Sequence, residues 1–391
     1  MRFESVGRRS FLKTMGAAGM LSALPEAAFG LHAGGGQIAS EVALPEADAN
    51  AKPKYSIKFG VIGLDHAHIM GITAAVIRGG GELVAFHSTL PKEIANFQKI
   101  YPQARLTKSE DEILNDPSIQ LIASASIPNL RAPLGIRAMK LDKDYLSDKP
   151  AVTTLEQLAE VRKVSAETGR MFAILYSERL EVRAAVQAGY LVKAGAIGKV
   201  VQTINIAPHQ VNAPSRPEWF WHPDQYGGIL CDIGSHQADQ FIYYTGSTTV
   251  DVTASQIANV NHSTHPEFQD FGDMMLRGNG GTGYVRVDWF TPNALGTWGD
   301  GRLFILGTEG YIELRKYIDV AGRPGANHLF IVDNKQARYI DCSKVELPFG
   351  PQFVGDIVNR THTAQDQEAA FLTMELVLKA QKGAKVLSFT A

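Results

Sequence analysis

A carboxylate and an imidazole stand four residues apart in the middle of the chain. They are Asp232 and His236, and the pair Gly227-Gly228 precedes them, which allows a sharp turn or a close approach of the backbone to a ligand. If a helix begins at about Asp232, the two side chains lie on one face of it. A carboxylate that holds an imidazole and stabilises its charged form is a common general-base arrangement. The spacing fits equally well a helix that Asp232 merely caps and in which His236 is a packed side chain.

A lysine with a restricted backbone is the second candidate for chemistry. Lys149 lies between Asp148 and Pro150, and the residue before a proline is confined to an extended conformation. The direction of its ammonium group is thereby fixed, as a catalytic cation requires. The alternative for this tripeptide alone is a surface turn.

The loop after the first predicted strand carries part of a nucleotide-binding pattern. The dinucleotide fingerprint has three glycines at this point, and only the first of them, Gly63, is present. Asp65 places a carboxylate where the backbone would approach a pyrophosphate. The end of the next strand has no acidic residue for a ribose hydroxyl, and Ser88 and Lys92 suit a 2′-phosphate better.

The same loop could bind a metal ion instead. Asp65, His66 and His68 offer two or three ligands, and His209 or His236 could complete the set. The other interpretation is that these side chains begin the following helix and line a polar cleft. Because metal motifs usually have firmer spacing, we expect no metal here.

Strands and helices alternate over residues 54–175. This alternation predicts a parallel sheet of the Rossmann type with helices on both faces, and a ligand at the carboxyl ends of the strands. Thr153 and Thr154 are capping residues for a helix that Gly169 ends. The other predicted elements are strands at 55–63, 82–86 and 121–125, and helices at 69–78, 93–101, 109–115 and 134–140.

Residues 176–391 predict an α+β domain with a large, mostly antiparallel open sheet. Over residues 283–290, Val285 and Val287 alternate with Tyr284 and Arg286, the period of a sheet that is covered on one face. The free face makes a homodimer or homotetramer the expected state. The predicted strands are 199–207, 250–260, 273–277, 283–290, 302–306 and 311–315, with helices at 184–194 and 367–382.

Together these features resemble the glucose–fructose oxidoreductase / inositol dehydrogenase family. The resemblance rests on the glycine that ends the first strand, on the Asp148-Lys149-Pro150 turn, and on Gly227-Gly228 through Asp232-x-Gly234-x-His236. It implies an NAD or NADP cofactor. It also implies that Lys149 contacts the substrate hydroxyl and helps to place the nicotinamide, that His236 removes the hydroxyl proton, and that Asp232 assists it. Asp148 departs from the family, in which Glu is commoner, as do the missing glycines of the loop.

Further residues are expected to contact the cofactor or the substrate. A sugar has apolar CH faces and hydroxyl edges, so aromatic and polar side chains near the hinge and in the second domain are the substrate candidates: Tyr176, Glu178, Arg179, His209, Trp219 and Trp298. The cofactor candidates lie in the first domain, at or just beyond the carboxyl ends of its predicted strands: Gly63, Asp65, His66, His68, Ser88, Lys92, Ser126, Pro128, Asn129 and Lys149.

The first residues of the chain are typical of an export signal. Arg8-Arg9 begins a twin-arginine pattern, and the apolar run 15–21 that follows it is too short to span a bilayer. We therefore predict a signal at 1–30, export by the twin-arginine machinery to the periplasm or beyond, and a flexible linker at 31–53. Because no cysteine lies near the expected cleavage region, we expect no lipid anchor.

Composition narrows the class of protein further. A hydrophobic fraction of 45% supports sizeable cores, and a net charge of −2 argues against a nucleic-acid partner. The two cysteines, Cys231 and Cys342, could form one disulfide in an oxidising compartment or remain free.

The sequence thus predicts an exported oxidoreductase that acts on a secondary hydroxyl of a sugar, cyclitol or glycoside. Free nicotinamide dinucleotide is scarce outside the cytoplasm, so we expect a cofactor that does not dissociate. Three alternatives remain. The first is a redox-neutral glycoside hydrolase or lyase that takes and returns a hydride. The second is a metal-dependent hydrolase that has lost the dinucleotide, and the third is a sugar-binding protein without activity.

Overall fold

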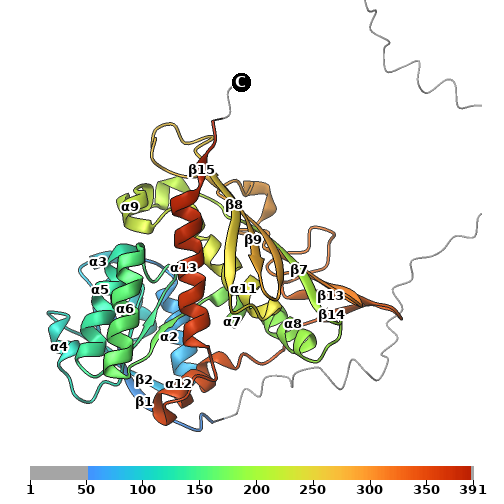
Figure 1. Ribbon diagram of the computed structural model, residues 1–391. Helices are drawn as coiled ribbons and strands as arrows, with labels where there is room; N and C mark the ends of the chain where they lie inside the picture. Colours follow the sequence, from blue (N-terminus) through green and yellow to red (C-terminus); the bar gives the residue numbers. More distant parts are fainter. Residues whose placement is uncertain (1–51, 389–391) are drawn as a thin grey trace, which may run out of the picture. The chain divides into compact units, whose positions relative to one another are not determined.

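The computed structural model describes residues 52–388. The predicted export signal lies outside these residues, as does the predicted linker except for Lys52 and Pro53. The described residues build two sheets, one after the other along the chain (Figure 1).

The first sheet contains six strands in the order β3-β2-β1-β4-β5-β6. Parallel strands that are covered on both faces are apolar along their length, and every residue of β1 except Lys58 is buried. Each neighbouring pair of strands is parallel, which confirms the predicted Rossmann-type sheet. The strands are β1 Ile57–Ile62, β2 Gly81–His87, β3 Arg105–Leu106, β4 Leu121–Ser124, β5 Asp144–Ser147 and β6 Phe172–Ile174.

The helices of this domain lie near the predicted positions, with one difference. α5 begins at Pro128 rather than at Leu134 and contains Pro133 in its interior. Pro133 cannot donate to the carbonyl of Asn129, and that carbonyl instead accepts a hydrogen bond from Gln157 Nε2 at 2.9 Å. The helices are α2 Ile69–Arg78, α3 Pro91–Ile100, α4 Asp111–Leu114, α5 Pro128–Lys140 and α6 Leu155–Thr168.

The second sheet contains nine strands in the order β14-β13-β12-β11-β7-β10-β9-β8-β15. Its pairs are antiparallel except β7 with β10 and β8 with β15, which confirms the predicted mostly antiparallel sheet. Two strands that were not predicted, β13 and β14, extend it at one edge. The strands are β7 Val200–Pro208, β8 Val250–Ala258, β9 Phe271–Gly278, β10 Gly281–Asp288, β11 Arg302–Gly307, β12 Gly310–Arg315, β13 His328–Asp333, β14 Ala337–Asp341 and β15 Lys385–Val386.

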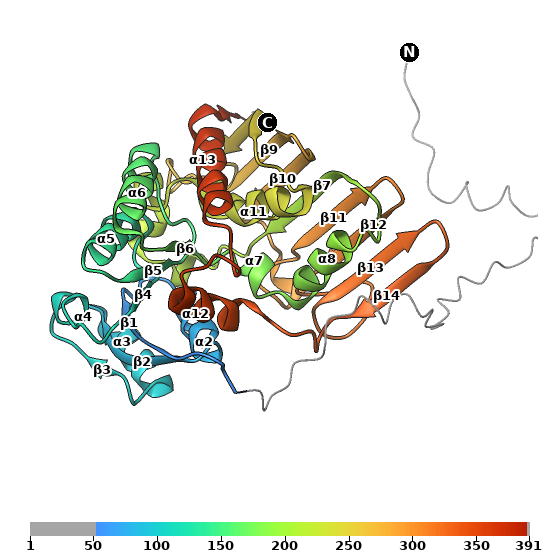
Figure 2. The same ribbon diagram turned by 60° about the horizontal axis from the view of Figure 1, so that its bottom comes forward.

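Helices cover one face of the second sheet and leave the other face open. Figure 2 shows α8 (Arg183–Lys193) and α11 (Gly234–Thr245) on the covered face, where α8 contacts β12 and β13 and α11 contacts β7 and β10. The alternation predicted for β10 is confirmed, because Val285 and Val287 are buried against this layer. Met275, Leu306 and Tyr311 point to the opposite side and are exposed.

The C-terminal helices connect the two sheets. α13 (Gln367–Gly383) lies between them and contacts α6 on one side and α11 and β8 on the other (Figure 1). α12 (Phe349–Asn359) packs on α2, and Phe353 and Val354 share a core with β1. Among the described residues no helix is both long and apolar enough to cross a bilayer. Cys231 and Cys342 are buried free thiols.

Candidate active site

Two glycines shape the turn that leads into α11. Gly227 and Gly228 have φ values of +88° and +85°, which other residues rarely adopt. A Cβ on Gly228 would also meet the side chain of Gln381 at 2.3 Å. The chain then forms α10 (Ile229–Asp232) and continues directly into α11. The helical segment therefore begins at Ile229 and not at Asp232, which is not its N-terminal cap.

Asp232 forms an ion pair with Lys149. The lysine Nζ donates to Asp232 Oδ1 at 2.9 Å, and the two side chains are only 5% and 16% exposed. Burial by itself would raise the pKa of Asp232, but the ammonium group of Lys149 lowers it below its usual value. Within the described residues no hydrogen bond joins Asp232 to His236, which differs from the predicted pairing. The carboxylate thus positions the lysine rather than the imidazole.

His236 lies on the wall of the same cavity as a neutral ring. Burial lowers its pKa to about 3, so at neutral pH one ring nitrogen carries a free lone pair, as a proton acceptor requires. Tyr176, which was predicted to contact the substrate, packs edge-on against His236 with ring centroids 6.4 Å apart. It is fully buried, and its hydroxyl donates to the carbonyl of Ala370. Tyr176 therefore supports the ring of His236 and does not line the cavity.

Asp148 connects the loop at residues 63–68 to the turn that carries Lys149. Its carboxylate accepts hydrogen bonds from Nδ1 of His66 and of His68, both at 3.0 Å, from Arg131 at 3.1 Å and from the N–H of Lys149 at 2.8 Å. Burial by itself would raise the pKa of Asp148, but the charges of His68 and Arg131 and these hydrogen bonds hold it well below its usual range. Burial lowers the pKa of His66 to about 4.

The structure changes the set of candidate metal ligands. His66, His68 and Asp148 offer ligand atoms that all lie within 4.8 Å of one another, whereas Asp65 and His236 are not part of this cluster. Both oxygens of Asp148 already accept hydrogen bonds, and the guanidinium of Arg131 places a positive charge beside them. This charge opposes a second cation, so we expect a hydrogen-bonded network rather than a metal site.

Treatment with a chelator is accordingly expected to leave the activity unchanged. Elemental analysis of the purified protein and the rate before and after dialysis against a chelator are the two measurements. A stoichiometric transition metal that is lost together with activity in His66→Ala would contradict this expectation. The exposed residue His222, which pairs with Glu218, provides the matched control as His222→Ala.

A cavity of about 340 Å³ lies where β1 and β5 end. Its walls combine charged groups with aromatic rings, as ligand sites commonly do. The ring of His209 lies 4.6 Å from that of Trp298, and Trp298 lies 4.4 Å from Tyr317. The cavity is lined by His66, His68, Pro128, Arg131, Lys149, Ser177, Glu178, His209, Gln210, Arg216, Trp219, Phe220, Asp232, His236, Trp289, Trp298 and Tyr317.

The predicted substrate residues divide into two groups. Glu178, His209, Trp219 and Trp298 line this cavity together with Lys149, Asp232 and His236. Other lining residues were not predicted: Arg131, Ser177, Gln210, Phe220, Trp289 and Tyr317. Ser177, Gln210 and Phe220 are chain neighbours of the predicted Glu178, His209 and Trp219, and Arg131 follows the predicted Asn129 closely, so proximity in the chain is the signal that could have indicated these four.

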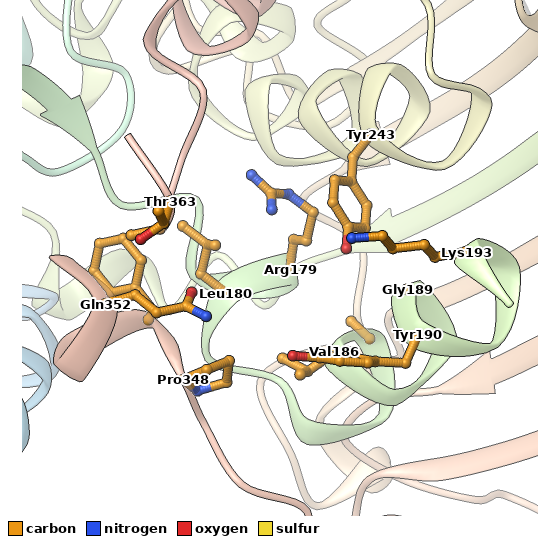
Figure 3. Close-up of a pocket in the computed structure, with 13 residues that line it drawn as sticks. Arg179, Leu180, Val186, Gly189, Tyr190, Lys193, Tyr243, Pro348, Gln352 and Thr363 are labelled. Atoms are coloured by element: carbon orange, nitrogen blue, oxygen red, sulfur yellow. The ribbon is translucent and has the colours of Figure 1, made fainter. Parts of the chain in front are cut away.

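Arg179 lines a different pocket from the other predicted substrate residues, which does not support its predicted contact with the substrate. Its guanidinium donates to both oxygens of Asp239 at 2.6 and 2.9 Å and lies over the ring of Tyr243. Figure 3 shows this pocket of about 300 Å³, which Lys193 and Gln352 also line. Adjacent residues of a helical turn point in different directions, and α7 (Ser177–Leu180) therefore turns Glu178 and Arg179 toward separate pockets.

A second cavity of about 450 Å³ shares His66, Arg216 and Trp219 with the first one. Asp65 and Lys92 also line it. Positive charge at the beginning of a helix favours phosphate, and the loop at 63–68 leads directly into α2. The two cavities thus lie side by side along the carboxyl ends of the strands, where open α/β sheets bind dinucleotides.

The loop itself retains the part of the nucleotide-binding turn that needs glycine. Gly63 has φ of +85°, and a Cβ there would lie 2.0 Å from Ser126 Oγ. Burial raises the pKa of Asp65 above its usual value. The residues of this loop are therefore compatible with the dinucleotide, despite the two missing glycines.

The remaining cofactor candidates take different positions. Pro128 and Lys149 line the first cavity, and Asn129 has a buried Oδ1 without a hydrogen-bond partner in the described chain. Ser126 Oγ is hydrogen-bonded to Ser124 at 2.8 Å, and Ser88 Oγ accepts from the N–H of Leu90. The two serines shape the loops beside the site and are not on either cavity wall.

Comparison with known proteins agrees with this architecture. Residues 57–176 match the model of the oxidoreductase family with an NAD-binding Rossmann fold, and residues 185–313 match the GFO/IDH/MocA C-terminal domain. The chain therefore belongs to the GFO/IDH/MocA family, which confirms the resemblance seen in the sequence.

Three similar proteins illustrate the relationship. A protein of Erwinia carotovora atroseptica SCRI1043 that is assigned as an oxidoreductase is 45% identical, with 85% of this chain and 100% of that chain covered and a TM-score of 0.83. The D-xylose dehydrogenase of Paenarthrobacter nicotinovorans is 26% identical over 39% of this chain and 40% of its own length. A 3-ketoreductase of Actinomadura kijaniata, solved with NADP and TDP-benzene, is 16% identical over 86% of this chain and 100% of its own, with a TM-score of 0.70, and shares the fold. The chain spans about half the length of the curated relatives that it matches.

Proposed function

We propose that this protein is an exported oxidoreductase that transfers hydride between a tightly held nicotinamide cofactor and a secondary hydroxyl of a sugar, cyclitol or glycoside. The observation that carries the proposal is the joint position of Lys149 and His236. Both line one cavity beside the carboxyl ends of a Rossmann sheet, and the lysine is held there by Asp232 at 2.9 Å.

The protein's own residues supply the proton chemistry of such a reaction. The ammonium group of Lys149 is fixed by Asp232 and can donate to the oxygen of a substrate hydroxyl, which orients it. The neutral ring of His236 can then accept the hydroxyl proton as the O–H bond breaks and an N–H bond forms. When bound, a nicotinamide accepts or returns the hydride of the carbinol carbon. In the first cavity Pro128 and Lys149 would border the nicotinamide end of the cofactor.

The walls of the cavity support a polyhydroxylated substrate. Trp289, Trp298 and Tyr317 present ring surfaces that can pack on apolar CH faces, while Glu178 and Gln210 present acceptors and donors for hydroxyl groups.

The open face of the second sheet, with exposed Met275, supports the expected homodimer or homotetramer. Sedimentation of the protein as a monomer at micromolar concentration would contradict this expectation.

The predicted export signal makes retention of the cofactor a testable part of this proposal. A protein that crosses the membrane folded can load its cofactor in the cytoplasm, and a bound ligand stabilises the fold by RT ln(1 + [L]/Kd). The chain without residues 1–30 is therefore expected to carry NAD or NADP near stoichiometry after extensive dialysis. The measurement is the absorbance and mass spectrum of whatever the denatured protein releases.

A matched pair of glycine variants controls this experiment. Gly63→Ala places a methyl group against Ser126 and should empty the protein, whereas Gly71→Ala in α2 meets no atom within 4 Å and should retain the nucleotide. A wild-type protein that emerges empty and binds added NAD(P) no better than millimolar would contradict the proposal. Free sugar released without a net change in nicotinamide absorbance would instead favour the redox-neutral hydrolase.

A further inference from the structure

The imidazole of His236 lacks a partner for one of its nitrogens. Nδ1 is buried and makes no hydrogen bond with any described residue. For Nε2 to accept a proton from the substrate, the neutral ring must carry its own proton on Nδ1. A buried N–H requires an acceptor, and no hydrogen bond joins this nitrogen to Asp232, whose Oδ1 accepts from Lys149.

A second carboxylate in the same cavity has one unused oxygen. Glu178 Oε2 accepts from Lys316 Nζ at 2.7 Å and from Gln237 Nε2 at 3.0 Å. Oε1 is also buried and has no partner within residues 52–388. Glu178 is 2% exposed and lines the cavity together with His236. The two residues thus line the same cavity, and each has a buried polar atom without a partner in the described chain.

In the other three histidines of the cavity, Nδ1 already has a hydrogen-bond partner. His209 Nδ1 lies 3.2 Å from the carbonyl of Ala207, so the neutral ring donates there. Nδ1 of His66 and of His68 lie 3.0 Å from the oxygens of Asp148. Among the four histidines on this wall, His236 is thus the one whose Nδ1 can donate to Glu178.

The charges around His236 agree with this assignment. The charged groups that act on His236 are Glu178 from α7, Lys149 and Asp148 from the turn after β5, and His68 from the loop after β1. Lys316 pairs with Glu178, and the ring of Tyr176 packs edge-on against the imidazole. Asp148 and Asp232 are neutralised by Arg131 and Lys149. The carboxylate of Glu178 opposes the lowering of the pKa of His236 by burial more than any other charge does.

We propose that Glu178 is the positioning residue of His236: it accepts the Nδ1–H, which fixes the tautomer with Nε2 free toward the substrate, and it stabilises the imidazolium that forms. The inference rests on the proposed function for the role of the proton transfer. Catalytic hydrogen bonds are often long in the absence of substrate and shorten in the complex, so the missing direct bond is compatible with it. Glu178 remains ionised throughout, and the proton from the substrate stays on Nε2.

The tautomer of His236 can be measured without any turnover. Nitrogen-15 NMR distinguishes protonated from bare ring nitrogens, and His236→Asn identifies the signal among the 11 histidines. In the wild-type protein we expect the proton on Nδ1. Because removing Glu178 alone leaves Lys316 buried and unpaired, the test uses the double variant Glu178→Leu with Lys316→Met, which leaves neither charge. In it we expect the proton to move to Nε2.

The negative charge of Glu178 and its capacity to accept a hydrogen bond from His236 can be tested separately with an amide variant. Glu178→Gln with Lys316→Met removes both charges but keeps an amide oxygen that can accept from Nδ1, so the Nδ1–H tautomer should persist while turnover falls, because the imidazolium loses the charge that stabilises it. Glu178→Leu with Lys316→Met should lose the acceptor as well as the charge, with turnover lower by on the order of 10²-fold. Glu181→Gln, which alters a glutamate paired with Arg78 outside the cavity, should change neither quantity.

The outcomes distinguish this inference from the proposed function. A wild-type ring with its proton on Nε2, or an unchanged tautomer in Glu178→Leu with Lys316→Met, would overturn the role of Glu178. Absence of turnover with every sugar and cyclitol tested, together with the expected change of tautomer, would contradict the proposed reaction and leave the link between Glu178 and His236 intact.

Discussion

Replacement of His236 or of Lys149 by alanine is expected to lower turnover by about two to four orders of magnitude, the usual contribution of a positioned acid–base group. His236→Ala removes the proton acceptor, and Lys149→Ala removes the ammonium group that Asp232 holds at 2.9 Å. Single-turnover absorbance of the nicotinamide, measured with a substrate that the wild-type protein oxidises, reports the chemical step directly.

The two variants need different controls for folding. The ring of His236 lies on the cavity wall and makes no hydrogen bond to any residue of the described part of the chain, so His236→Ala should retain the fold. Lys149→Ala leaves Asp232 with an uncompensated charge in the cavity, and Lys149→Met with Asp232→Asn provides a variant that has neither charge. Lys163→Ala, at an exposed position on α6, should behave as the wild type. Turnover near the wild-type rate in both single variants would remove these residues from the mechanism.

The largest expected effect on stability comes from Asp148. Asp148→Asn removes the charge that pairs with Arg131, whose side chain is 1% exposed, and a buried ion pair that loses one partner typically costs about 3–5 kcal/mol. Because four donors from three segments meet at this carboxylate, the variant should also loosen the loop at 63–68. Urea unfolding monitored by circular dichroism measures the change in the free energy of unfolding.

An exposed ion pair of α5, the helix that also carries Arg131, provides the comparison for the free energy of unfolding. Glu110 pairs with Arg137 at the surface of α5, and Glu110→Ala should cost no more than about 1 kcal/mol. A similar cost for both variants would contradict the role of Asp148 as a buried anchor.

The pH dependence of stability should differ between the Asp148 variant and the wild type. The pKa of Asp148 is held well below its usual value in the folded protein, so the folded state favours the ionised form. Its contribution to stability is fully present above the unfolded-state pKa of about 3.9 and is lost as the pH falls through the lower folded-state value. Asp148→Asn cannot titrate at this position, and its stability should fall less steeply below about pH 4.

The arrangement of elements and several candidate active-site residues could be predicted from the sequence alone. Alternating strands and helices require a parallel sheet with its ligand site at the carboxyl ends, and Gly63 ends β1 because only glycine fits beside Ser126. Local rules of this kind depend on near neighbours in the chain, which is why Lys149, Asp232 and His236 could be named. The family comparisons then confirmed the class of protein.

Pairings between side chains depended on tertiary structure. Asp232 and His236 are four residues apart, but the carboxylate of Asp232 is hydrogen-bonded to Lys149, which lies 83 positions away in the chain. Glu178 and Arg179 are neighbours in sequence, yet α7 directs them into separate pockets. A buried carboxylate pairs with the cation that packing places beside it, because an unpaired buried charge is unfavourable. The spacing of residues along the chain does not predict which cation that is. The sequence by itself therefore determined the scaffold and the chemical groups at the site, whereas only the packing of the two sheets decided which of these groups act on one another.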